Sequence, residues 1–245
     1  MTDTLLLALL ICFAALLYSS VGHAGASGYL AAMALFGLAP EVMKPTALVL
    51  NLVVATVGTI RYARAGCFVW EVFWPFAIVS VPLAFLGGAL SLPVSAYKIV
   101  LGGVLLFAAW RLAFQQSGSA SAEAKPVSLP LALVLGAAIG FLSGLTGVGG
   151  GIFLSPLLLF LGWADTRKTA GVSVVFILVN SVAGLLGHLT GVQQVPRAIV
   201  WWAPAALAGG LIGAELGSRR LTPITMRRML AIVLVVAGVK MLLTR

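Results

Sequence analysis

The sequence predicts an all-α integral membrane protein built as an inverted repeat, in which each half forms a short broken-helix hairpin plus three transmembrane helices. Of the 245 residues, 61% are hydrophobic and only 9% are charged, whereas an ordinary soluble domain carries about 25% charged residues. A set of glycines also recurs 125 residues later, namely Gly22, Gly25, Gly37 and Gly66 followed by Gly147, Gly150, Gly162 and Gly191. A duplicated hydrophobic half interrupted by glycines is typical of a secondary transporter whose substrate site lies where the halves meet.

The apolar segments follow the same order in both halves. In the first repeat, residues 1–114, they lie at 5–18, 29–38, 47–60, 73–90 and 99–114. A polar linker at 115–128 precedes the second repeat, residues 129–245, whose segments lie at 129–142, 152–161, 172–186, 198–216 and 229–243. The fourth segments share a motif, since Pro82 with Gly87-Gly88 recurs as Pro204 with Gly209-Gly210. We expect the two repeats to form one integrated membrane domain.

The second segment of each half is too short to cross a bilayer, which takes about 20 residues. Either it continues the first segment as one long helix broken by glycines, or the two form a hairpin whose ends lie on the same side. Lys and Arg gather on the cytoplasmic side of membrane proteins. The hairpin places ten Lys and Arg residues on one side of the membrane and five on the other. One broken helix would place eight and seven, which shows no bias. The hairpin is therefore predicted, with three full crossings in each half and both termini outside.

In the hairpin topology, the five basic residues on the outer side are Lys44, Lys98, Arg197, Lys240 and Arg245. The net charge of +9 is spread singly or in pairs between apolar runs, so it indicates helices oriented in a lipid bilayer and argues against nucleic-acid binding. No spacing of cysteines, histidines or carboxylates suggests a metal site. We expect neither a metal nor a cofactor.

Two glycine-rich breaks, at 19–28 and 143–151, are the strongest candidates for a substrate site. Non-helical backbone at membrane depth is tolerated where protein or a water-filled cavity satisfies its amides. The helix that restarts after each break presents unpaired amides and a positive dipole end, which favour an anion. The candidate residues in and after the breaks are Gly22, His23, Gly25, Ser27, Gly147, Gly149, Gly150, Gly151 and Ser155. The alternative is that these glycines only allow helices to pack closely.

Polar residues inside the apolar segments form a second group of candidates. They are Thr46, Asn51, Ser173 and Asn180. The alternative role of the two asparagines is interhelical hydrogen bonding. His23 is the better functional candidate of the two histidines, as a donor to an anion or as a pH-sensitive group, whereas His188 is expected at the membrane interface. No charged residue falls centrally in an apolar segment, which argues against a buried carboxylate relay.

The second break, Gly147-Val148-Gly149-Gly150-Gly151 with Pro156 after it, resembles the TauE/SafE family of sulfite exporters and anion permeases. The resemblance covers both halves and implies a multi-pass transporter of the cytoplasmic membrane that moves small oxyanions or organosulfonates. The first half departs from this pattern. In place of the triple glycine it has Gly22-His23-Ala24-Gly25-Ala26-Ser27-Gly28, and Ala31 stands at the position that corresponds to Pro156. The two breaks are therefore not equivalent.

With the cell interior negative, expelling one anionic charge gains about 2.3 kcal/mol per 100 mV. Export would need no coupling ion, which agrees with the missing buried carboxylates. We therefore predict a secondary transporter or facilitator that exports a small anion such as sulfite or an organosulfonate.

An enzyme is the alternative, because Gly25-Ala26-Ser27-Gly28 matches the GxSG motif of rhomboid intramembrane serine proteases. Gly187-His188-Leu189-Thr190-Gly191 loosely resembles the histidine helix of the same proteases. In that case Ser27 and His188 would form a catalytic dyad, with the histidine activating the serine.

Overall fold

The computed structural model describes residues 2–114, 124–189 and 196–219, together with residues 235, 238, 239, 242 and 243. Most of the predicted linker, Gly191 and most of the predicted segment 229–243 lie outside these residues. The described helices are α1 (Thr2–Ser19), α2 (Ala26–Leu35), α3 (Pro40–Arg64), α4 (Trp70–Ala89), α5 (Val94–Phe114), α6 (Leu129–Thr146), α7 (Gly151–Leu161), α8 (Thr166–Leu189) and α9 (Ile199–Arg219). The predicted all-α class is confirmed.

The helix order follows the predicted repeat, but two helices begin earlier than their apolar segments. Helix α3 begins at Pro40 and α8 at Thr166, whereas the apolar segments begin at 47 and 172. The first turns of both helices are polar and escape a pattern based on hydrophobicity alone. Lys44 therefore lies inside a helix, where it is only 5% exposed, and not in a connection between helices as the apolar pattern suggests. The side of the membrane expected for it stays a prediction.

At the first break the chain turns back instead of continuing as one long helix. Helix α2 packs against α1, and the hydroxyl of Ser27 at the start of α2 donates a hydrogen bond to the Tyr18 hydroxyl at the end of α1. In the second half, α7 packs mainly against α8. The packing of α2 on α1 agrees with the predicted hairpin of the first half. The corresponding hairpin of α6 and α7 stays a prediction.

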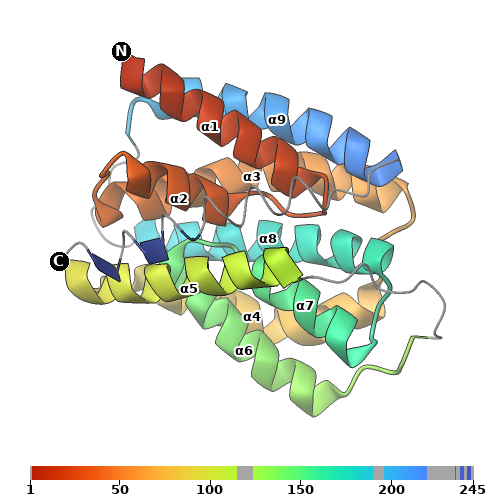
Figure 1. The fold of residues 1–245 in the computed structure, drawn as a ribbon. Helices are drawn as coiled ribbons and strands as arrows, with labels where there is room; N and C mark the ends of the chain where they lie inside the picture. Colours follow the sequence, from red (N-terminus) through yellow and green to blue (C-terminus); the bar gives the residue numbers. More distant parts are fainter. Residues whose placement is uncertain are drawn as a thin grey trace.

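The helices associate across the two halves (Figure 1). Helix α1 packs against α9, and α4 packs against both α6 and α8. The two longest helices, α3 and α8, lie against each other in the middle of the molecule. The first helix of each half therefore packs on the fourth helix of the other half.

Helices α3 and α8, which hold equivalent places in the two halves, run antiparallel. Near the start of α8, a Cβ added at Gly58 would lie 2.6 Å from the side chain of Val174. Further along α8 and nearer the start of α3, the Asn51 side chain lies 3.2 Å from the hydroxyl of Ser181. Opposite directions of equivalent helices are what an inverted repeat requires. The inverted relation of the complete halves stays a prediction, which this pairing supports.

The paired Gly-Gly motifs serve helix packing. A Cβ added at Gly87 would overlap the carbonyl of Phe141 in α6, and one at Gly88 would overlap the carbonyl of Gly184 in α8. The corresponding glycine in α9, Gly209, lies against the backbone of α1. Small residues let helices approach at such contacts, so close packing, the alternative role considered for the repeated glycines, applies to these motifs.

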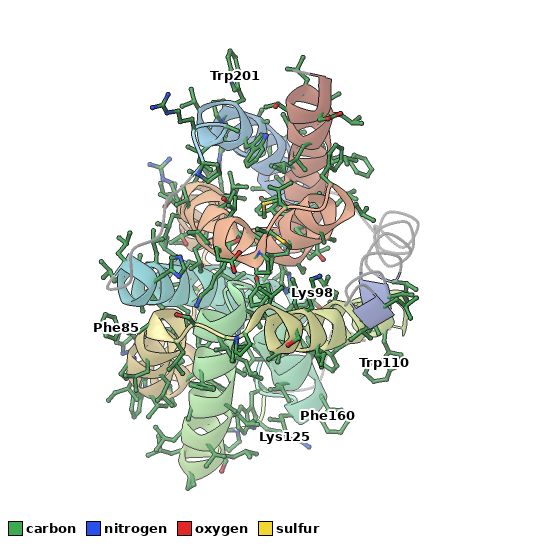
Figure 2. All side chains as sticks on the ribbon, turned by 90° about the vertical axis from the view of Figure 1, so that its left-hand side faces the viewer. Phe85, Lys98, Trp110, Lys125, Phe160 and Trp201 are labelled. Carbon is green, nitrogen blue, oxygen red and sulfur yellow. The ribbon has the colours of Figure 1, made fainter. Side chains whose placement is uncertain are left out.

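Apolar side chains cover the outside of the protein. Figure 2 shows large side chains that project away from the helices, among them Phe85, Trp110, Phe160 and Trp201, which are 39%, 56%, 88% and 64% exposed. Five of the described helices, α3, α4, α6, α8 and α9, are long and apolar enough to cross a membrane. Helix α6, expected as one arm of a short hairpin, is thus itself long enough to span. The protein is a multi-pass membrane protein.

Candidate functional site

The first break leaves a run of backbone amides without partners. The chain leaves α1 through a tight turn in which the amide of His23 donates to the Tyr18 carbonyl, and Gly25 at the start of α2 has a φ of 106°. Among the described residues, no hydrogen-bond acceptor is recorded for the amides of residues 24–28. The residues that carry these amides are buried.

The second break repeats this arrangement. Gly149 and Gly150 have φ values of 83° and 81°, in the left-handed region that side chains other than glycine rarely adopt. The amides of residues 148–152 likewise have no recorded acceptor in the described part of the chain, and the amides of residues 153 and 154 both donate to the Gly150 carbonyl. Neither α2 nor α7 carries a side-chain cap. Each short helix thus begins with free amides and the positive end of its dipole.

His23 joins the two breaks. Its Nε2 lies 3.2 Å from the carbonyl oxygen of Gly151 and 3.0 Å from the hydroxyl oxygen of Ser155. The Ser155 hydroxyl lies in turn 2.7 Å from that of Ser173 in α8. Four of the residues singled out from the sequence therefore meet in one buried polar chain.

Both ring nitrogens of His23 face carbonyl oxygens, since Nδ1 lies 3.2 Å from the carbonyl oxygen of Val21. A carbonyl oxygen only accepts hydrogen bonds. A neutral imidazole has one N–H and can donate to one of the two carbonyls, whereas an imidazolium can donate to both. A neutral ring with its hydrogen on Nδ1 can donate to Val21 and accept from the Ser155 hydroxyl at Nε2.

Asn51 reaches the second break from α3. Its Nδ2 donates to the Val148 carbonyl at 3.4 Å and to the Ser181 hydroxyl at 3.2 Å, while its Oδ1 has no partner among the described residues. A Cβ added at Gly149 would lie 2.6 Å from this Nδ2. Ser181 was missed in the sequence, where its equivalent 125 residues earlier is Thr56. A hydroxyl at both equivalent positions is the signal that could have identified it.

Three of the candidate residues are buried but have no recorded hydrogen bond with the opposite half. Thr46 donates to the Val42 carbonyl of its own helix. The Nδ2 of Asn180 likewise donates within its helix, to the Phe176 carbonyl, and its Oδ1 has no partner in the described part of the protein. Ser27 bonds Tyr18. The interhelical bonding considered for the asparagines is therefore recorded for Asn51 alone.

The predicted protease dyad does not form. The Ser27 hydroxyl donates to the Tyr18 hydroxyl at 2.6 Å. The Nε2 of His188 has no hydrogen-bond partner among the described residues, and His188 instead lines a separate cavity with Lys44. Without a histidine beside it, Ser27 lacks the base that would activate it.

The two remaining glycines place each break against the opposite half. A Cβ added at Gly22 would overlap Ala170 of α8, and one at Gly147 would lie 3.0 Å from the carbonyl oxygen of Lys44 in α3. Each break thus lies against the beginning of the long helix of the other half. This arrangement brings both breaks to the α3–α8 pair at the centre of the protein.

Lys44 is the one Lys, Arg, Asp or Glu among the buried side chains that the structure describes. Its Nζ donates to the carbonyls of Gly87 at 3.3 Å, Gly88 at 2.8 Å and Leu90 at 3.2 Å. These carbonyls lie at the C-terminal end of α4, and a cation stabilises this end of a helix. Pro40 in the first turn of α3 is the sequence signal that could have placed Lys44 inside a helix.

The comparisons with known proteins agree with this architecture. The family model described as sulfite exporter TauE/SafE matches residues 7–241. The probable membrane transporter protein y4hK of Sinorhizobium fredii is 43% identical over 244 residues, which cover 98% of this chain and 99% of that protein. The probable membrane transporter protein MJ0441 of Methanocaldococcus jannaschii is 28% identical, over 81% of this chain and 78% of that protein.

A third relative, the probable membrane transporter protein MamO of Paramagnetospirillum magneticum, is 27% identical over 75% of this chain but only 36% of its own length. No solved structure matches the chain at a significant level. The family model covers nearly the whole sequence, and the helices have the length and apolar surface that a bilayer requires. The chain is a membrane transporter that belongs to the sulfite exporter TauE/SafE family.

Proposed function

We propose that this transporter moves small oxyanions of the sulfite or organosulfonate type across the cytoplasmic membrane, in the direction of export. The observation that carries the proposal is the contact of His23 with Gly151 and Ser155, at 3.2 and 3.0 Å. It joins the two breaks and thereby gathers two runs of unpaired amides around one histidine. An oxyanion offers several acceptor oxygens and a negative charge, which match these donors.

The chemistry of binding follows from the donors. Backbone amides at helix N-termini bind anions because the N–H groups and the helix dipole both favour negative charge. Hydrogen bonds to a charged group contribute about 1.5–3 kcal/mol each, so a few of them hold an anion without any buried lysine or arginine at the breaks.

The surroundings of the breaks suit alternating access. His23, Ile177 and Asn51 lie against the glycines of the second break, and both breaks are buried. In this conformation the bound anion would be enclosed, and movement of one hairpin relative to the α3–α8 pair would open the site. Inverted repeats commonly provide this kind of rocking movement.

The proposed direction, export, follows from the charges of the buried side chains and from the membrane potential. None of the buried side chains that the structure describes is an aspartate or glutamate, and such carboxylates are what many proton-coupled transporters use. The membrane potential alone favours anion efflux by about 2.3 kcal/mol per charge and 100 mV. Efflux of a small anion therefore needs no coupling ion.

The test is sulfite flux in proteoliposomes that contain the purified protein. An imposed membrane potential, with equal proton and sodium concentrations on both sides, should drive sulfite toward the positive side, and protein-free liposomes should show no such flux. Flux that requires a proton or sodium gradient would refute uncoupled export. The absence of flux for sulfite and for simple sulfonates would refute the proposed substrate class.

A further inference from the structure

A cavity that none of the sequence-predicted site residues lines lies at one end of the α3–α8 pair. It holds about 410 Å³ of space, counting its open mouth. Its polar lining residues are Glu41 and Lys44 of α3, Ser91 after α4, Tyr97 of α5 and His188 of α8. Both halves of the protein therefore contribute to its wall.

The buried part of this cavity is positively charged. Lys44 is 5% exposed, and no carboxylate of the described residues lies within 4.0 Å of its Nζ. Its three N–H groups are used by the α4 carbonyls, but its charge is only partly offset by the helix dipole. Glu41, by contrast, is exposed, so solvent and salt screen the charge of its carboxylate.

His188 supplies an unused hydrogen-bonding group in the same wall. The residue is 7% exposed, and its Nε2 has no partner among the described residues. A buried polar atom without a partner costs free energy, unless a ligand or water satisfies it. The ring also hydrogen-bonds the Gly88 backbone, which occupies the hydrogen of the neutral imidazole. The protonated ring has a second N–H, on Nε2, for an oxygen acceptor.

The cavity adjoins the second break. Leu145, one residue before the end of α6, lines it, and the Tyr97 hydroxyl donates to the Thr146 carbonyl at 3.1 Å. A Cβ added at Gly147, in the second break, would lie 3.0 Å from the carbonyl oxygen of Lys44, which also lines the cavity. An anion that leaves the second break toward this end of the protein would meet the cavity next.

We propose that the cavity is a second anion site, which holds a small oxyanion between His188 and the buried charge of Lys44 at the mouth of the transport path. This inference rests on the proposed function, because it assigns the site to the same transported anion. The cavity lies at the start of α3, on the outer side in the predicted topology. The site is therefore the last one before release in export and the first one met by an anion supplied from that side.

The test compares sulfite flux from each side of oriented proteoliposomes in three variants. His188→Phe keeps a ring of similar size but removes the nitrogen, and His188→Gln keeps an N–H donor. Leu189→Phe is the matched control, because it places the same side chain at the next position of α8, where Leu189 is 55% exposed.

With sulfite supplied from the cavity side, His188→Phe should raise the concentration for half-maximal flux about tenfold, since a hydrogen bond to a charged group is lost. His188→Gln should recover most of this loss, and Leu189→Phe should resemble the wild type. With sulfite supplied from the other side, the concentration for half-maximal flux should be the same in all variants as in the wild type. An unchanged value for His188→Phe from the cavity side, or an equal rise from both sides, would overturn the assignment.

A binding measurement distinguishes an error in the proposed cavity site from an error in the proposed function. If wild-type proteoliposomes carry no sulfite, the proposed function fails, and calorimetric titration of purified protein with sulfite still tests the site. The wild type should then show a binding event that His188→Phe lacks, whether or not the breaks bind sulfite as well. Identical titrations of the two proteins, or no binding to the wild type, would overturn the second site.

Discussion

The Nε2 atom of His23, in the first break, lies 3.0 Å from the hydroxyl oxygen of Ser155, in the helix that follows the second break. The two residues are 132 positions apart in the chain and come from different halves of the repeat. The contact links the beginning of one short helix to the first turns of the other. It thereby places the unpaired amides of both breaks in one buried region at the centre of the protein.

Replacing His23 by phenylalanine should weaken anion transport strongly. The change removes the only side chain that the structure shows bonded to both Gly151 and Ser155, together with its N–H donors. Without this contact the two runs of amides are no longer held together, and loss of even one amide hydrogen bond to a charged ligand amounts to about 10- to 100-fold in affinity. Sulfite flux at low concentration measures the effect, and His23→Gln, which keeps a donor, should retain more activity. Equal flux in His23→Phe and the wild type would contradict a role in binding.

Replacing Gly149 by alanine should abolish transport and lower the thermal stability. Its φ of 83° and the short distance of 2.6 Å from an added Cβ to the Asn51 Nδ2 both oppose a side chain. Gly37→Ala is a matched control, because Gly37 has a similar φ of 71° with nothing within 4 Å of an added Cβ. Both variants suffer the backbone penalty of roughly 1–2 kcal/mol.

Only Gly149→Ala should in addition displace Asn51 from the second break. Thermal unfolding in detergent and sulfite flux together separate the two effects. If Gly37→Ala proved as inactive as Gly149→Ala, backbone strain alone would explain the loss, and the contact with Asn51 would be irrelevant to transport.

The hydrogen bond between Asn51 and Ser181 should couple α3 to α8. A double-mutant cycle with Asn51→Leu, Ser181→Ala and the double variant should give a coupling of about 0.6 kcal/mol, the average for such bonds within membrane proteins. Unfolding measured in detergent gives this value. Additive effects of the two single variants would show that the 3.2 Å contact does not contribute to stability.

The starts of α3 and α8 should lie on opposite sides of the membrane if the repeat is inverted. Glu41 and Lys168, at these two starts, are both exposed. In a protein whose Cys12 and Cys67 are replaced by alanine, a membrane-impermeant maleimide should label Glu41→Cys in intact cells and Lys168→Cys only after permeabilisation. Labelling of both from the same side would exclude the inverted topology.

Much of this arrangement follows from glycine and hydrophobicity alone. The repeated glycines mark the turns, because positive φ at Gly22, Gly25, Gly147 and Gly150 is a local requirement that the residue type reveals. The apolar segments likewise mark the helices, since lipid exposure demands apolar residues over a helix length. Because these features depend on local sequence, the order of residues is enough to predict them.

The partners of the breaks could not be predicted in the same way. Lys44 appears in a polar stretch between apolar runs, yet α3 begins at Pro40 and buries it against α4. Ser181 gains its role only because α3 and α8 pack antiparallel and bring it to Asn51. Asn180, one position away, faces its own helix instead. Such differences depend on which face of a helix meets its neighbour, which the composition of one chain does not determine.

The most direct test of the central claim is a crystal structure with bound selenite, the heavier analogue of sulfite, located by the anomalous scattering of selenium. Two runs of unpaired amides joined by His23 predict a selenium peak within hydrogen-bonding distance of residues 24–28 and 148–152. Occupied selenite elsewhere in the protein, with no peak at the breaks, would contradict the claim that the breaks form the anion site.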